Sequence, residues 1–148
     1  QKVPQPWHLE IWGDGEEKHN LQSLINSLGL QQYIELKGNT NRPLSILRQA
    51  DLFVLSSRFE GLPTVLIEAL FCQCNIIATD CPHGAAEILE DGRWGILVQN
   101  ENIEALTHAI IEKLNNYNPI PPELLLNRAF DFSIEKATDE WIENLISS

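Results

Sequence analysis

The stretch LFVLSSRFEGLPTVLIEALF, residues 52–71, contains the pattern that decides the fold. Its first four residues, Leu52 to Leu55, are an uninterrupted apolar run of the kind that forms a buried parallel strand. A short loop follows, and the residues from Pro63 to Phe71 are typical of an apolar helix, because proline suits a first helical turn. A strand, a loop and a helix in this order predict one unit of a parallel α/β sheet.

The same alternation continues on both sides of this unit. We expect strands at 7–12, 33–36, 52–55, 75–79 and 95–98, helices between them, and closing helices at 102–115, 122–130 and 134–146. This order predicts an α/β fold with a doubly wound parallel sheet of the Rossmann-like type. Ligands bind at the carboxyl ends of such strands, so we expect a cleft at loops 13–15, 37–42, 56–63 and 80–86.

Length and charge narrow the classes of function. A chain of 148 residues is typical of one compact domain, so we assign residues 1–148 to a single domain. Its 21 acidic and 10 basic residues give a net charge of −11, which repels nucleic acid and anionic lipid. A nucleotide is still compatible with this charge, because helix N-termini and loop amides bind phosphate without Lys or Arg.

The cysteines and the hydropathy indicate a cytoplasmic setting. Cys72, Cys74 and Cys81 are odd in number and lie beside apolar residues, which favours reduced thiols over a disulfide framework. No apolar run approaches the roughly 20 residues that span a bilayer, and the first residues lack a signal-peptide core. We therefore expect a soluble chain, and the lack of an initial Met suggests a piece of a longer protein.

Glu60 and Glu68 are the acids best placed for chemistry. They are eight residues apart, so in a regular helix they would share one stripe about 12 Å apart, at a rise of ~1.5 Å per residue. A nucleotide sugar has about this length. Carboxylates accept hydrogen bonds from hydroxyls, whereas the free amides expected from Gly61 to Thr64 would hold a diphosphate between them.

At these residues the sequence resembles the retaining glycosyltransferases of family 4, the glycosyl transferases group 1. Their GT-B fold has two facing Rossmann-like domains, and Glu60 to Glu68 matches their E-x7-E motif. The resemblance continues, in the same order, at the Gly13-Asp14-Gly15 turn, at residues 50–56, and at segments 78–80, 87–89 and 95–98. It covers nearly all of residues 7–147.

The resemblance implies a role for each matched position. Glu60 would be catalytic and contact hydroxyls of the donor sugar, and Glu68 would hold the ribose hydroxyls. The sugar, diphosphate and base would lie among Gly13, Lys37, Gly38, Gly61, Leu62, Pro63, Thr64 and His83. The chain would then be a partial donor-binding domain. It lacks its first β-α unit, which supplies an Arg and a Lys to the diphosphate, and the amino-terminal acceptor domain.

The function implied is retaining transfer of a sugar from a nucleotide diphosphate sugar, most naturally a UDP-sugar, to a saccharide or lipid-linked acceptor in glycan biosynthesis. We expect no cofactor and no metal, no activity from this chain alone, and a cytoplasmic enzyme whose peripheral membrane association is left open. Two alternatives stay open: a nucleotide-sugar epimerase or phosphorylase of the same fold, and a non-catalytic nucleotide-sugar-binding module.

Three other motifs favour less specific interpretations. The glycine pair at Gly13 and Gly15 lacks the third glycine of a dinucleotide fingerprint, because residue 18 is Lys18. A zinc site needs four ligands, and four candidates lie close together in sequence: Cys72, Cys74, Cys81 and His83. Cys72 ends a predicted helix and Cys74 precedes a predicted strand, which disfavours their convergence on one zinc ion. Trp94 is more typical of packing than of sugar stacking, and Lys37 and Arg58 are the basic residues best placed near a ligand.

Overall fold

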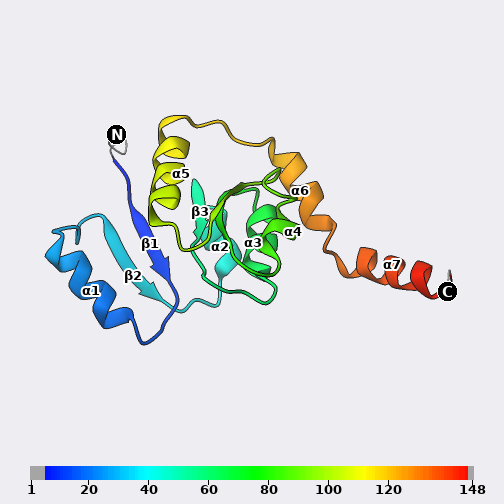
Figure 1. Cartoon of the computed structure of the whole chain (residues 1–148), viewed down its shortest axis with the longest axis horizontal. Coiled ribbons are helices and arrows are strands. Elements are labelled where there is room, and N and C mark those ends of the chain that lie inside the picture. Colours follow the sequence, from blue (N-terminus) through cyan, green and yellow to red (C-terminus); the bar gives the residue numbers. More distant parts are fainter. Residues whose placement is uncertain (1–5, 147–148) are drawn as a thin grey trace. The chain divides into compact units, whose positions relative to one another are not determined.

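The computed structural model describes residues 6–146, which divide after Pro43 into two compact units (Figure 1). Each unit is built on a parallel sheet with its own helices. Among the described residues, no helix is both long enough and apolar enough to cross a membrane.

The first unit is a single β-α-β element. Strands β1 (Leu9–Trp12) and β2 (Ile34–Gly38) pair in parallel, and helix α1 (Lys18–Ser27) connects them. The helix lies alongside β2 and buries Ile25, which is 5% exposed (Figure 1). The helix is followed by Gly29 at φ +67°, a left-handed position that glycine adopts without strain.

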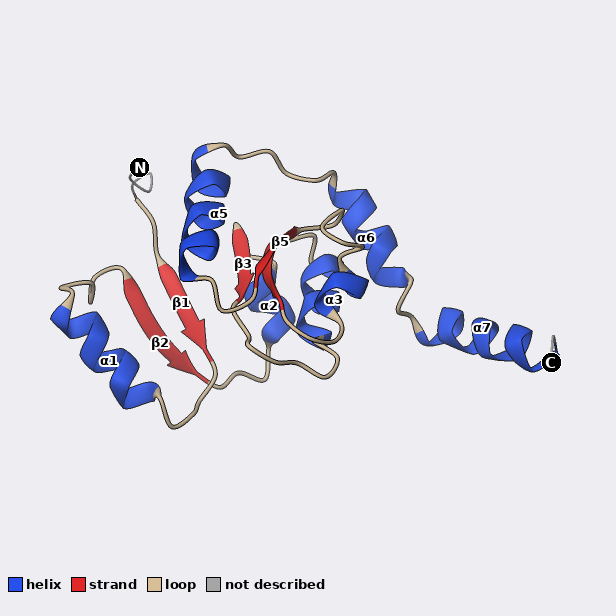
Figure 2. Cartoon of the chain, viewed as in Figure 1, coloured by secondary structure: helices blue, strands red, loops and turns tan. Residues whose placement is uncertain are grey.

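The second unit holds three parallel strands in the order β3 (Leu52–Leu55), β4 (Asn75–Asp80) and β5 (Ile96–Gln99). Its helices are α2 (Pro43–Leu47), which begins at the boundary between the units, α3 (Thr64–Phe71), α4 (Ala85–Ile88), α5 (Ile103–Asn115), α6 (Pro122–Phe130) and α7 (Ile134–Ile146). Helix α5 lies on one side of the strands and α3 on the other (Figure 2).

The core of the second unit forms around β4. Successive side chains of a strand point to opposite faces, so Ile76 and Ala78 pack with α3, α4 and α6, whereas Ile77 packs with α5. The largest fully buried side chains are Leu66, Leu70, Ile77, Ile88, Leu89 and Leu125. Each contributes about 1.5–3 kcal/mol relative to an exposed side chain. Helices therefore cover both faces of this sheet, as a doubly wound fold requires.

The structure confirms the parallel α/β fold and refines two expectations. The strands form one two-stranded sheet and one three-stranded sheet, one in each unit. Helix α3 begins at Thr64, because Pro63 has φ −75° and ψ 77°, outside the helical region. The condition of a regular helix between Glu60 and Glu68 is therefore not met, and the ~12 Å separation that depended on it does not apply.

Candidate functional site

The loop that follows β3 is anchored by two neighbouring strands. The buried Thr79 hydroxyl on β4 donates a short hydrogen bond to the Ser57 carbonyl, and the Asn100 side-chain amide, just after β5, donates to the Arg58 carbonyl at 2.8 Å. The Ser57 hydroxyl in turn donates to Oε1 of Glu60 at 2.6 Å. Parallel strands place these groups at the same edge of the sheet, so the loop has a defined course.

Glu60 is the acid at the centre of this loop. Its side chain is half-buried, and the Ser57 hydroxyl is its hydrogen-bond partner within the described residues. No Lys, Arg or His of the described chain lies within ion-pair distance of its carboxylate. A carboxylate has about four acceptor positions, so Glu60 can still accept hydrogen bonds from ligand hydroxyls.

The turn from Gly61 to Thr64 differs from the expected row of free amides. The Thr64 amide donates to the Leu62 carbonyl at 2.8 Å, which closes an inverse γ-turn at Pro63. Pro63 has no N–H, so this segment offers two donors, Gly61 and Leu62, instead of a continuous row. The Val65 amide is the next one that donates to no group in the described chain. The expectation of free amides from Gly61 to Thr64 is therefore wrong, and the amides without an acceptor in the described chain are those of Gly61, Leu62 and Val65.

The loop after β4 contacts the Glu60 loop directly. Gly84 has φ +93°, and a Cβ at this position would lie 2.5 Å from Cδ of Pro63. The ring of His83 lies edge-on to the ring of Phe59, with their centroids 6.0 Å apart. The structure therefore places His83 beside the loop that carries Glu60.

Glu68 lies at the start of the second turn of α3 and is half-buried. Its carboxylate makes no hydrogen bond or ion pair with another described side chain. Burial is the main cause that raises the pKa of the nearby Cys72 thiol, Arg48 opposes this rise, and the Glu68 charge adds a smaller increase. An acid that is partly removed from water and has no partner among the described side chains is suited to accept hydrogen bonds from a ligand.

The remaining predicted site residues lie in the first unit. The Gly13 amide donates to the Gly38 carbonyl at 2.8 Å, so the ends of β1 and β2 meet. Lys37 lies on the same strand end, and its Nζ is 3.0 Å from Glu35 and 3.4 Å from Glu10. Its hydrogen bond to Glu35 is the main cause that raises the pKa of Lys37. The Lys37 charge is thus engaged by its own sheet.

The same face of the first unit holds a cluster that the sequence did not indicate. Ligating atoms of His8, Glu10 and Glu35 all lie within 4.8 Å of one another, close enough to share a metal ion. All three residues are exposed, and the Lys37 ammonium already bridges the two carboxylates. An internal cation at this position disfavours a second one.

The sequence matches the family profile of glycosyl transferases group 1 over residues 1–126. The chain belongs to this family. An uncharacterised glycosyltransferase of Methanocaldococcus jannaschii is 36% identical over 90% of the chain and 40% of its own length. The poly(glycerol-phosphate) alpha-glucosyltransferase of Bacillus subtilis is 31% identical over 97% of the chain and 21% of its own length. The chain thus spans less than half of these relatives.

Solved structures show the same fold. The lipopolysaccharide outer core galactosyltransferase WaaB has a TM-score of 0.84 at 22% identity, over 95% of this chain and 41% of that one. Anabaena HepE, solved in complex with UDP, has a TM-score of 0.80 at 22% identity, over 99% of this chain and 42% of that one. The chain thus has the Rossmann-like fold of GT-B glycosyltransferases.

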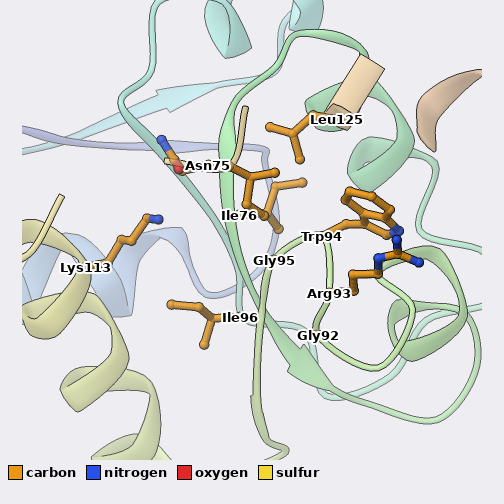
Figure 3. A pocket seen from close by; sticks show the side chains of 10 residues that line it. Asn75, Ile76, Gly92, Arg93, Trp94, Gly95, Ile96, Lys113 and Leu125 are labelled. Atoms are coloured by element: carbon orange, nitrogen blue, oxygen red, sulfur yellow. The ribbon is translucent and has the colours of Figure 1, made fainter. Parts of the chain in front are cut away.

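In the second unit, a pocket of about 230 Å³ lies away from Glu60, at the amino ends of β4 and β5 (Figure 3). Figure 3 shows Trp94 and Arg93 on one side of it and Lys113 on the other, with Ile76 between them. Trp94 also packs on the main core, and the Arg93 guanidinium lies 4.6 Å from its ring centroid. Trp94 therefore has the packing role predicted for it.

The three cysteines are free thiols that occupy separate positions in the second unit. Cys72 donates to the Leu44 carbonyl and Cys74 to the Ala50 carbonyl, each at 3.4 Å. Burial raises the pKa of Cys74 to about 11, so it is protonated at neutral pH. In the part of the chain that the structure describes, the three sulfurs and His83 do not converge on a shared metal position.

Sequence reasoning missed the residues that hold the Glu60 loop. Thr79 and Asn100 are 19 and 40 residues beyond Glu60, and no local pattern links them to it. One signal was present, because both follow the apolar core of a predicted strand, where a parallel sheet gathers its side chains. Ser57 lies within the motif, but its hydrogen bond to Glu60 depends on the course of the loop.

Proposed function

We propose that this chain binds the donor in an enzyme that transfers a sugar, with retention, from a UDP-sugar to a saccharide or lipid-linked acceptor. The observation that carries the proposal is Glu60. It lies on an anchored loop at the carboxyl edge of a parallel sheet, has no cationic partner among the described residues, and is followed by the unpaired amides of Gly61 and Leu62.

The chemistry of these groups suits the parts of such a donor. A carboxylate that retains acceptor positions binds sugar hydroxyls, and backbone N–H groups bind phosphate oxygens, including the diphosphate that leaves. Glu68, half-buried and without a partner in the described chain, would accept the two ribose hydroxyls. His83 would border the sugar, and the ends of β1 and β2 at Gly13, Lys37 and Gly38 would border the base.

The comparisons support a UDP-sugar as the donor and transfer of its sugar to an acceptor. TarM of Staphylococcus aureus, solved with UDP, is 27% identical, has a TM-score of 0.75, and is matched over 95% of this chain and 29% of its own. The names of relatives describe alpha-linked glucosyl and N-acetylglucosaminyl transfer to polymers. We infer that the rest of a longer protein supplies the acceptor site and the basic side chains at the diphosphate, and that the enzyme is cytoplasmic and needs no metal.

Calorimetry on the full-length protein tests the donor. We expect UDP to bind, ADP to bind more weakly, and at least one of UDP-glucose, UDP-galactose, UDP-N-acetylglucosamine and UDP-N-acetylgalactosamine to bind more tightly than UDP. Incubation of that donor with a lipid-linked saccharide should release UDP and retain the anomeric configuration. Epimer exchange without transfer would establish the epimerase alternative, and binding without any turnover would establish a binding module.

A further inference from the structure

We propose that Thr79 and Asn100 are positioning residues that set the orientation of Glu60 toward the donor sugar. This inference rests on the proposed function and adds to it, because it assigns part of the affinity for the donor sugar to two residues that do not themselves contact the ligand. Three successive contacts carry it.

The first contact extends the sheet beyond its last strand pair. The β3–β4 ladder ends with Leu55 opposite Ala78, yet the chain after β3 is held further by the Thr79 hydroxyl, which donates to the Ser57 carbonyl. Thr79 is 5% exposed, and the Ser57 carbonyl is nearer to its hydroxyl, at 2.5 Å, than the Leu55 carbonyl at 3.4 Å, so Ser57 is the favoured acceptor. The position of Ser57 is therefore fixed from β4.

The second contact passes this constraint to the acid. The Ser57 hydroxyl donates to Oε1 of Glu60 at 2.6 Å, a distance typical of a bond to a charged acceptor. This bond restricts the rotation of the Glu60 side chain and leaves its Oε2 atom without a partner in the described chain. Ser57 thus determines which Glu60 oxygen faces a ligand hydroxyl, and Thr79 determines the position of Ser57.

The third contact fixes the residue between them. The Asn100 Nδ2 donates to the Arg58 carbonyl at 2.8 Å, while its Oδ1 accepts from the Glu101 amide at 2.9 Å, which sets the orientation of the side-chain amide. The Nε atom of Arg58 also lies 3.7 Å from Oε1 of Glu101, but the two side chains are 85% and 70% exposed. Such a pair contributes little in water, so the Asn100 amide is the effective anchor.

Together these contacts keep the loop ordered before the sugar arrives. Without them, the loop would have to become ordered on binding, and the entropy lost would weaken the grip on the sugar hydroxyls. The nucleotide would be affected less. Glu68 lies on α3, outside this loop, and the Gly61 and Leu62 amides are followed by Pro63, which is buried and lies against Gly84 independently of Thr79 and Asn100. If these contacts position Glu60, their removal should therefore weaken binding of the UDP-sugar more than binding of UDP.

The test uses the full-length protein and three variants. Thr79→Val removes the hydroxyl at constant shape, Thr79→Ser keeps it, and Asn100→Asp keeps Oδ1 while replacing the donor. Thr138→Val on α7 is the matched control, because its hydroxyl bonds within its own helix. We expect Thr79→Val and Asn100→Asp to weaken binding of the preferred UDP-sugar by about three- to tenfold, the range for one hydrogen bond, and UDP by less than twofold. Thr79→Ser and Thr138→Val should match the wild type.

Two further measurements make the result decisive. In a Glu60→Ala background, Thr79→Val should have no added effect on UDP-sugar affinity, because the group that it positions is gone. Trypsin cleavage after Arg58 should accelerate in Thr79→Val and Asn100→Asp relative to cleavage after Arg93, an exposed site outside the loop. This proteolysis reports loop order without any ligand.

The outcomes separate the two proposals. A wild-type protein that binds neither UDP nor any of the UDP-sugars overturns the proposed function, and proteolysis still decides whether the anchors order the loop. A wild-type protein that prefers a UDP-sugar, with unchanged affinities or equal losses for UDP and UDP-sugar in Thr79→Val and Asn100→Asp, overturns the positioning role alone.

Discussion

At the scale of single residues, Gly84 is one of the points at which the two loops of the candidate site touch. Its φ of +93° is costly for any residue with a Cβ, and a Cβ there would lie 2.5 Å from Cδ of Pro63. Pro63 is buried and closes the turn before α3, so it has little room to move. The contact therefore couples the loop after β4 to the segment that presents Gly61 and Leu62.

Gly84→Ala should lower the free energy of unfolding by about 2–4 kcal/mol, the sum of a strained φ and an overpacked contact. Urea denaturation measures this change. Gly15→Ala is the matched control, because no atom lies within 4 Å of a Cβ at that position, and it should change stability by less than about 0.5 kcal/mol. Equal effects of the two substitutions would contradict the contact.

Glu60 and Glu68 should differ in the part of the donor that they hold. Glu68→Gln should weaken binding of UDP by about 1.5–3 kcal/mol, because hydrogen bonds to charged groups contribute that much. Glu60→Gln should leave UDP affinity nearly unchanged and weaken the UDP-sugar. Calorimetry with both ligands distinguishes the two, and equal losses for both ligands in both variants would refute the assignment.

Cys74 gives the second unit a defined response to alkaline pH. Burial raises the folded-state pKa of its thiol to about 11, above the ordinary value of 9.0. The unfolded chain therefore loses this proton first, and the free energy of unfolding should fall as pH rises from about 9 to about 11. Urea melts across this range should show a steeper decline than those of Cys74→Ala, and parallel declines would contradict the shift.

At the scale of elements, Arg128 joins α6 to α4. Its guanidinium donates to the carbonyls of Glu87 and Ile88 at the end of α4, at 2.7 and 3.0 Å, and pairs with Asp131 and Glu90. Only 12% of its side chain is exposed. The last carbonyls of a helix lack partners within the helix, so Arg128 acts as the cap of α4, the helix that follows His83 and Gly84.

Arg128→Met keeps the apolar stem and removes every donor, so we expect a loss of about 2–3 kcal/mol in the free energy of unfolding. Arg93→Met is the control, because Arg93 also pairs with Glu90 but is 68% exposed, and its loss should stay below about 0.5 kcal/mol. Chemical denaturation of both variants provides the comparison. A loss for Arg128→Met as small as that for Arg93→Met would show that α4 needs no cap.

The elements also show what local pattern can predict. The apolar runs at β3 and β4 and the apolar helix α3 were identified because a strand with packed side chains on both faces leaves a continuous apolar signal in sequence. The γ-turn at Pro63 was missed, because proline is equally suited to a first helical turn. The hydrogen bonds of Thr79 and Asn100 were missed because they depend on how strands far apart in sequence come together.

At the scale of the whole molecule, the chain divides into two units, and alternation of strands and helices gave no sign of the division. The boundary at Pro43 lies inside a stretch that reads as an ordinary loop and helix start. The larger unit holds Glu60, Glu68 and His83, and the smaller holds Gly13, Lys37 and Gly38. The sugar-binding and base-binding roles proposed above thus fall on separate units.

The chain should fold but not transfer sugar by itself. The second unit has helices on both faces of its sheet and a continuous core around β4, so folding needs no further segment. Catalysis is different, because the chain spans less than half of the relatives compared above. Within the described residues, no cation lies against the Glu60 loop except the exposed Arg58. Without nearby cations, the leaving diphosphate is not stabilised electrostatically. Without an acceptor site, the acceptor is not held close to the donor sugar. Residual UDP binding should therefore be weak. EDTA should leave it unchanged, since the one group of three ligating atoms found among the described residues, His8, Glu10 and Glu35, already holds the Lys37 ammonium. A thermal melt, UDP calorimetry with and without EDTA, and a transfer assay on the 148-residue chain measure these outcomes. Efficient transfer by this chain, or UDP binding that disappears with EDTA, would show that the mechanism is wrong.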